Sequence, residues 1–134
     1  MKKKMRITIL ATTMCMLFGS ITVFAETKEF HFSVKQEQYD TGVWTASKAD
    51  DEQTAYVTPT SITGKGIIWA AVYDSRGGTQ YTVDVGISDG DENVRKTADY
   101  YNEGHAGTIY RIIAGDSEHT VTSKEFKASG RWTP

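Results

Sequence analysis

The chain has 134 residues, and the first 25 differ in composition from the rest. They hold all four methionines, both leucines, the single cysteine (Cys15) and four basic residues without any acidic one. The remaining 109 residues contain 11 basic and 17 acidic residues, a net charge of −6 with histidine neutral. This size, charge and cysteine content exclude a multidomain protein, a disulfide-stapled miniprotein and a protein drawn to nucleic acid by its net charge.

Residues 1–25 have the pattern of a signal peptide. Four of the positions 2–6 are basic, and residues 7–24 form an apolar stretch. The sequence Val-Phe-Ala at 23–25 satisfies the small-x-small rule for cleavage at its end. An uncleaved membrane anchor is the alternative, since about 18 apolar residues just span a bilayer, but polar residues and glycine interrupt the stretch. We therefore expect a secreted, extracellular product, residues 26–134, without stable membrane insertion.

The composition of this product predicts an all-β fold. It contains no Leu and no Met, which are leading helix formers, but 14 Thr, 8 Val, 7 Ile and 7 Tyr, which suit a pleated surface. Six or seven short strands with turn signals between them predict a single antiparallel β-sandwich domain, with a small barrel as the alternative. Its 13 aromatic residues can fill a core that has no disulfide.

The first half of the domain contains three predicted strands. Apolar and polar side chains alternate over residues 30–34, which predicts a strand with one buried face. Residues 53–61 are rich in threonine and extended, with Pro59 marking an edge or a strand end. Residues 67–73 (IIWAAVY) are apolar on both faces, as in a central strand, and place Trp69 in the core.

The second half contains three more. Residues 81–87 alternate, and the two glycines within 74–78 predict a hairpin turn that makes this strand an antiparallel neighbour of the preceding one. Residues 109–114 form another apolar strand, and 126–132 alternate up to the C-terminus.

Two segments lack a clear strand pattern. Residues 36–52 are polar and predict a loop, with Val43 and Trp44 as an anchor. Residues 93–103 suit either a helical turn or a strand.

An acidic turn is the one candidate metal site. Asp89, Asp91 and Asn93 fill alternate positions, as oxygen ligands of Ca²⁺ do in an EF-hand loop. That loop requires glycine and glutamate where this chain has Val94 and Tyr100. The sequence therefore favours a solvated turn, with a calcium site as the alternative.

No catalytic constellation emerges from the spacing. His31, His105 and His119 show neither H-x-H nor H-E-x-x-H spacing, so a zinc site is unsupported. Ser117 lies two residues before a histidine but outside any nucleophile elbow. We expect structural or solvated histidines, no cofactor, no catalytic residue and a non-enzymatic protein. A pair of carboxylates that cleaves glycosides stays open, because 17 acids always allow some pair.

Aromatic residues are the candidate ligand contacts. Trp44, Tyr100, Tyr101 and Trp132 lie in polar surroundings or close to a terminus, where they could stack on sugar rings or dock a protein. Core filling is the competing role, since the domain has no leucine. The net charge of −6 opposes binding to nucleic acid and to anionic lipid.

Four segments carry a resemblance: IIWAAV at 67–72, the tyrosine pair at 100–101, IYRIIAG at 109–115 and ASGRWTP at 128–134. Together they resemble a family of small secreted proteins of Gram-positive bacteria, with a signal peptide, a β-rich body and a C-terminal Ser-Gly-x-Trp motif. The family has no defined function, so the resemblance implies a secreted β-rich protein and no site residue. Lactococcin-like bacteriocins share the size, the signal peptide and the tryptophan-rich ends more loosely.

Three functional hypotheses follow. The leading one is a secreted, monomeric binding module for an unknown protein or glycan partner at or outside the cell surface. The second is a bacteriocin-like antibacterial effector, and the third is a small cell-wall hydrolase.

Overall fold

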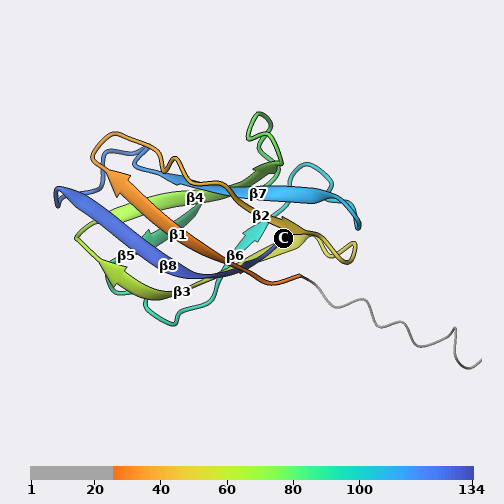
Figure 1. The fold of residues 1–134 in the computed structure, drawn as a ribbon, viewed down its shortest axis with the longest axis horizontal. Coiled ribbons are helices and arrows are strands. Elements are labelled where there is room, and N and C mark those ends of the chain that lie inside the picture. The colour runs from red at the N-terminus through yellow and green to blue at the C-terminus, as the bar shows by residue number, and fades with distance from the viewer. Residues whose placement is uncertain (1–25) are drawn as a thin grey trace, which may run out of the picture.

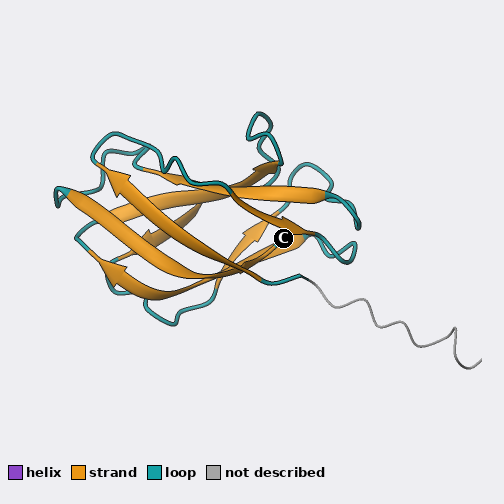
Figure 2. Ribbon diagram, viewed as in Figure 1, coloured by secondary structure: helices purple, strands orange, loops and turns teal. Residues whose placement is uncertain are grey.

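The computed structural model describes residues 26–134, which form eight β-strands and no helix (Figure 1, Figure 2). The predicted signal peptide and Cys15 lie outside the described residues. Because Cys15 is the only cysteine of the chain, the domain holds together without a disulfide. Within this described part, no helix has the length and apolarity needed to cross a membrane.

The strands are arranged in two antiparallel sheets. In chain order they are β1 (Lys28–Lys35), β2 (Trp44–Ser47), β3 (Thr54–Thr63), β4 (Ile67–Asp74), β5 (Val85–Ser88), β6 (Lys96–Asp99), β7 (Ile109–Gly115) and β8 (Glu125–Thr133). Sheet A has the order β1-β8-β3-β6, and sheet B has the order β2-β7-β4-β5 (Figure 1). The predicted β-sandwich is confirmed, with eight strands instead of six or seven. The small barrel is wrong, because the two sheets do not close on each other.

Between the sheets lies a core of branched and aromatic side chains. The largest fully buried apolar side chains are Trp132, Tyr110, Phe30, Phe32, Phe126, Ile68, Ile87, Ile112, Val34, Val57 and Val72. The rings of Phe30 and Phe32 stack with centroids 4.5 Å apart. Alternate residues of β1 and β8 are buried, because successive side chains of a strand point to opposite faces of the sheet. The predictions for residues 30–34, 109–114 and 126–132 are confirmed.

Strand β8 organises sheet A. It pairs along its length with β1 on one side and with β3 on the other, so the first and last strands of the domain are neighbours. The shared register sets Glu29, Arg131 and Thr58 in one row across three strands. Residues far apart in sequence therefore meet on the outer face of this sheet.

Pro59 occupies a β-bulge inside β3. The strand shifts register between Pro59 and Ser61 and has already passed the last residue that pairs with β6. Proline has no N–H to donate, so it is tolerated where a neighbouring strand has ended. Strand β3 itself continues to Thr63. Opposite lies Gly130, at which a Cβ atom would come within 2.1 Å of the carbonyl oxygen of Thr58.

Two segments without a strand pattern contain short edge strands. The predicted loop at 36–52 includes β2, which has only four residues and buries one of them, Ala46, fully. Val43 is 64% exposed and is not an anchor, whereas Trp44 packs against the core. In 93–103 the chain forms β6, so the helical turn is wrong and the strand is right.

The predicted strand at 81–87 is shorter than expected. Only residues 85–88 form β5, although β5 does pair antiparallel with β4 as predicted. Thr82 lies outside the backbone pairing of β4 with β5, and its side chain is fully buried. Its hydroxyl oxygen accepts a hydrogen bond from the Val72 N–H at 3.0 Å. A side chain here replaces the backbone partner that a continuous strand would supply.

Trp69 is not a core residue. Its neighbours Ile68 and Ala70 face the core, so its indole lies on the outer face of sheet B, over Gly86. There it is partly buried, and its ring N–H donates to the Thr120 hydroxyl at 3.3 Å. The prediction failed because the segment is apolar on both faces, which leaves the inward direction undetermined.

Candidate functional site

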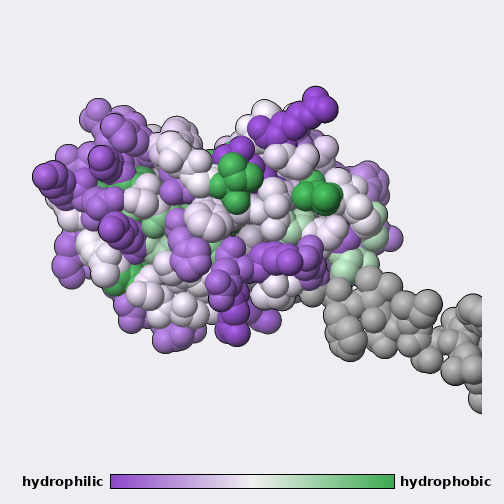
Figure 3. Space-filling view, viewed as in Figure 1, coloured by the Kyte–Doolittle hydropathy of each residue, from purple (hydrophilic) through white to green (hydrophobic). Residues whose placement is uncertain are grey.

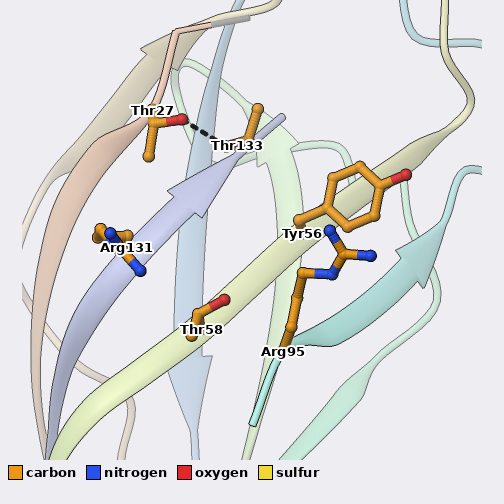
Figure 4. A pocket seen from close by; sticks show the side chains of 6 residues that line it. All are labelled: Thr27, Tyr56, Thr58, Arg95, Arg131 and Thr133. Carbon is orange, nitrogen blue, oxygen red and sulfur yellow. Dashed lines mark hydrogen bonds between the residues drawn. The ribbon is translucent and has the colours of Figure 1, made fainter. Parts of the chain in front are cut away.

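The outer face of sheet A carries a depression of about 250 Å³. It is lined by Thr27, Tyr56, Thr58, Arg95, Arg131 and Thr133 (Figure 4). We call this site the sheet A depression. All six side chains can donate hydrogen bonds, and the four hydroxyl groups can also accept them.

Strand alternation places four of these residues together. In β3 and in β8, every second side chain faces the core, and the residues between them face outward. The antiparallel register sets Tyr56 opposite Thr133 and Thr58 opposite Arg131. Strand β8 pairs with β1 on one side and β3 on the other, and β3 also pairs with β6 as far as Val57, so Tyr56 and Arg131 stand on strands that are paired on both sides.

Thr27, the residue before β1, closes the depression on one side. Its hydroxyl lies 2.9 Å from the hydroxyl of Thr133 (Figure 4). The segment that leads into the domain is thereby tied to the last strand, and both hydroxyls are held at the rim.

Arg95 is held over an aromatic ring. Its guanidinium carbon lies 4.7 Å from the centre of the Tyr56 ring, which is the geometry of a cation–π contact. The Tyr56 hydroxyl in turn donates a hydrogen bond to the Glu52 carboxylate, and this bond raises the pKa of the tyrosine above its ordinary value. Glu52, Tyr56 and Arg95 thus form a chain of contacts that orients the guanidinium.

Arg131 projects from the centre of the sheet. Its cross-strand neighbours are Thr58 and Glu29, and its side chain is exposed. The Glu29 carboxylate lies 3.6 Å from His31. Over residues 26–134, neither Arg131 nor Arg95 has a carboxylate within 4.0 Å.

Next to the depression, His31 lies between Ser129 and Glu29. Its Nδ1 is 3.0 Å from the Ser129 hydroxyl, and its Nε2 is 3.6 Å from the Glu29 carboxylate. A hydrolytic triad also needs donors for the oxyanion. Ser129 sits in the middle of β8, where the backbone amides are engaged by the neighbouring strands. The arrangement orients an exposed histidine, as expected from the sequence, and does not supply an activated nucleophile.

Two of the four predicted aromatic contacts face inward. Trp132 is 1% exposed and belongs to the core, so it has no face to offer a ligand. The Tyr100 ring is partly buried, 5.9 Å from the Tyr110 ring and 4.9 Å from the Lys48 ammonium. Burial raises the pKa of Tyr100 above its ordinary value.

The other two are separate from each other, and only Tyr101 is exposed, because Trp44 is partly buried against the core. The Trp44 ring N–H donates to Asp40 at 3.0 Å, and the ring meets His31 edge-on at 5.3 Å. Tyr101 is 58% exposed and follows β6. None of the four predicted aromatic residues lines the sheet A depression.

Two of the three predicted calcium ligands, Asp89 and Asp91, have other partners, and the side chain of Asn93 is exposed. The Asp89 carboxylate accepts from the Lys65 ammonium at 3.1 Å, which lowers the pKa of Asp89. Asp91 lies 2.9 Å from the Lys96 ammonium and accepts from the backbone and hydroxyl of Ser88. Across the described residues, no cluster of three His, Cys, Asp or Glu side chains could hold a metal ion. The cluster serves as a turn, stabilised by two lysines.

No pattern in the sequence pointed to the residues of the depression as a group. Arg131 and Thr133 were predictable as outward-facing positions, since they alternate with Trp132 and Gly130. Their meeting with β3 depends on the strand order, which no local pattern encodes. Arg95 lies before a strand of only four residues, so the sequence carried no signal for its position.

Comparison with known proteins gave no match: no protein-family model, no curated protein and no solved structure resembles this chain significantly. The resemblance to small secreted Gram-positive proteins stays a prediction. Any functional conclusion therefore depends on the chemistry of the side chains.

Proposed function

We propose that this protein is an exported, non-enzymatic saccharide-binding module that holds its ligand in the sheet A depression. The main support is the lining itself, which combines three threonines, one tyrosine and two arginines on one face of the sandwich. Export is the expectation from residues 1–25, and a binding role agrees with the lack of a catalytic motif in the sequence.

The lining suits recognition better than turnover. Its six residues include no carboxylate and no imidazole, the groups that most often transfer protons in catalysis. The nearest carboxylate that contacts the lining, that of Glu52, already accepts the Tyr56 hydroxyl hydrogen bond. The short hydroxyl side chains of Thr58 and Thr133 stand on paired strands, so they offer hydrogen bonds at little cost in conformational entropy.

A saccharide fits this surface better than a protein partner. Protein interfaces have an apolar, aromatic centre, whereas none of the large exposed apolar residues lines the depression. In Figure 3, hydrophilic residues predominate on the visible face and apolar ones are scattered. The volume of about 250 Å³ is slightly below the usual range for whole small-molecule sites, which suits one ring of a longer glycan.

Binding can be tested by titration. The purified protein would be titrated calorimetrically with a panel of neutral and acidic oligosaccharides, and at least one should bind. Thr58→Phe places a ring in the depression and should abolish that binding. The matched control is Thr45→Phe, which adds the same ring to an exposed threonine on sheet B. If no oligosaccharide binds, or if Thr58→Phe binds as well as the wild type, the proposal is wrong.

A further inference from the structure

We infer that the sheet A depression recognises a sugar that carries one carboxylate, a uronic acid residue of a glycan. This inference rests on the saccharide-binding function proposed above and names the ligand class. It is carried by two guanidinium groups, Arg95 and Arg131, that share one hydroxyl-lined depression.

Five of the eleven lysines and arginines of residues 26–134 lie within 4.0 Å of a carboxylate, and Arg95 and Arg131 are among the six that do not. Lys28, Lys65 and Lys96 each lie within 3.1 Å of a carboxylate. By contrast, no carboxylate of residues 26–134 lies within 4.0 Å of Arg95 or Arg131. In a domain with 17 acidic and 11 basic residues, two such guanidinium groups in one depression leave positive charge available to a ligand.

Arg95 is pre-organised for a carboxylate. Its contact with the Tyr56 ring limits where the guanidinium lies, and its N–H donors have no carboxylate partner within 4.0 Å among residues 26–134. The tyrosine is itself held by Glu52. A planar guanidinium binds a carboxylate through two parallel hydrogen bonds, and the contact with the Tyr56 ring already places this one beside the depression.

Arg131 supplies the second donor set, next to the hydroxyls that a sugar ring requires. Its cross-strand neighbour on β3 is Thr58, and Thr133 lies two residues further along β8. These hydroxyls can both donate to and accept from the ring hydroxyls, while the guanidinium can only donate. The combination matches a hydroxylated ring with one acidic substituent.

The surrounding charge limits how acidic the ligand can be. Glu29 lies across from Arg131, and the domain has a net charge of −6. At physiological salt, charges beyond about 8 Å are largely screened, so the local balance is set by the two arginines and the nearby carboxylates of Glu29 and Glu52, which leaves room for one ligand charge at most. A polyanion would extend over the acidic remainder of the surface and be repelled. A singly charged carboxylate is therefore favoured over a doubly charged phosphate monoester.

The test compares matched ligands by NMR titration of the ¹⁵N-labelled protein. The probes are a disaccharide that contains one glucuronic acid, the same disaccharide with its carboxyl reduced to an alcohol, and glucose 6-phosphate. We expect the acidic disaccharide to bind at least about tenfold more tightly than its reduced form, the effect of one charge-assisted bidentate contact. Raising the salt from about 50 mM to about 500 mM should weaken that preference.

Variants of the two arginines test whether their charge, and not an intact fold alone, is needed for the preference. Arg95→Gln and Arg131→Gln should each remove most of the preference for the acid, and Arg131→Lys should restore only part of it, because lysine lacks the bidentate fork. The matched control, Arg76→Gln, lies in the exposed turn after β4 and should bind as the wild type does. Unchanged amide spectra away from the depression would show that each variant is folded.

The outcomes distinguish a failure of the uronic acid inference from a failure of saccharide binding itself. Equal binding of the acidic and reduced disaccharides, unaffected by either arginine variant, would overturn the uronic acid inference but leave saccharide binding intact. Tighter binding of glucose 6-phosphate would also overturn it. Failure of every saccharide to shift the amide signals of the lining residues would overturn both.

Discussion

Asp116 provides the sharpest test of how the loops at one end of the sandwich are held. It follows β7 and is 2% exposed. Its Oδ1 accepts hydrogen bonds from the backbone N–H groups of Thr120 at 2.6 Å and Val121 at 3.0 Å, and its Oδ2 accepts from that of Glu37 at 2.8 Å. One carboxylate thus connects the segment after β1 with the segment before β8.

Asp116→Asn preserves the shape and removes the charge. If the amide oxygen keeps its bonds to Thr120 and Val121, the amide nitrogen must face the N–H of Glu37, and two donors oppose each other. Leaving a buried donor unsatisfied costs about 1–3 kcal/mol, and a hydrogen bond to a charged group contributes more than a neutral one. We therefore expect the free energy of unfolding to fall by about 2–3 kcal/mol at neutral pH.

The loss should depend on pH. Burial raises the pKa of the Asp116 carboxyl, but the N–H groups of Glu37, Val121 and Thr120 together outweigh it, so the pKa is lowered from its ordinary value of 3.8. A lowered pKa means that the carboxylate stabilises the fold fully above the unfolded value, and that this contribution disappears as the pH falls through the folded value. The difference between wild type and Asp116→Asn should shrink below about pH 4.

Urea unfolding followed by tryptophan fluorescence, from pH 7 down to pH 3, would measure both effects. Asp99→Asn is the matched control, since its exposed carboxylate accepts only the hydroxyl hydrogen bond of Thr54 and should change stability by less than about 0.5 kcal/mol. A loss for Asp116→Asn that is as small as the control, or that stays constant down to pH 3, would refute the reasoning.

Three further substitutions test the core and the strand pairing. Trp132→Ala should lower the free energy of unfolding by about 3 kcal/mol, because the indole is buried, and an unchanged melting temperature would place it at the surface. Thr82→Val should cost about 1–3 kcal/mol and speed hydrogen exchange of the Val72 amide, which loses its acceptor, whereas Thr82→Ser should keep that amide protected. Gly130→Ala should reduce the yield of folded protein, since its Cβ would meet the carbonyl oxygen of Thr58, and wild-type stability would contradict the observed register.

The residues of the candidate site could be predicted from the sequence only in part. Composition drew attention to Trp44, Tyr100, Tyr101 and Trp132, because aromatic residues are common ligand contacts. Alternation along β8 indicates that Trp132 is buried, because it lies on the same face as Phe126 and Ala128. For Tyr100, burial follows from packing against Tyr110 of β7 and against Lys48, which lies far earlier in the sequence.

The all-β class, the disulfide-free core and the positions of the long strands could be predicted from the sequence, because local composition and a period of two specify them. The tertiary structure alone decided which strands became neighbours, where the short edge strands formed and which way the doubly apolar β4 turned Trp69. The strand order also creates the sheet A depression, since Arg95, Arg131 and Thr27 come together only when β8 lies between β1 and β3. Pairing between distant strands depends on burial summed over the whole domain, and no single segment contains that information.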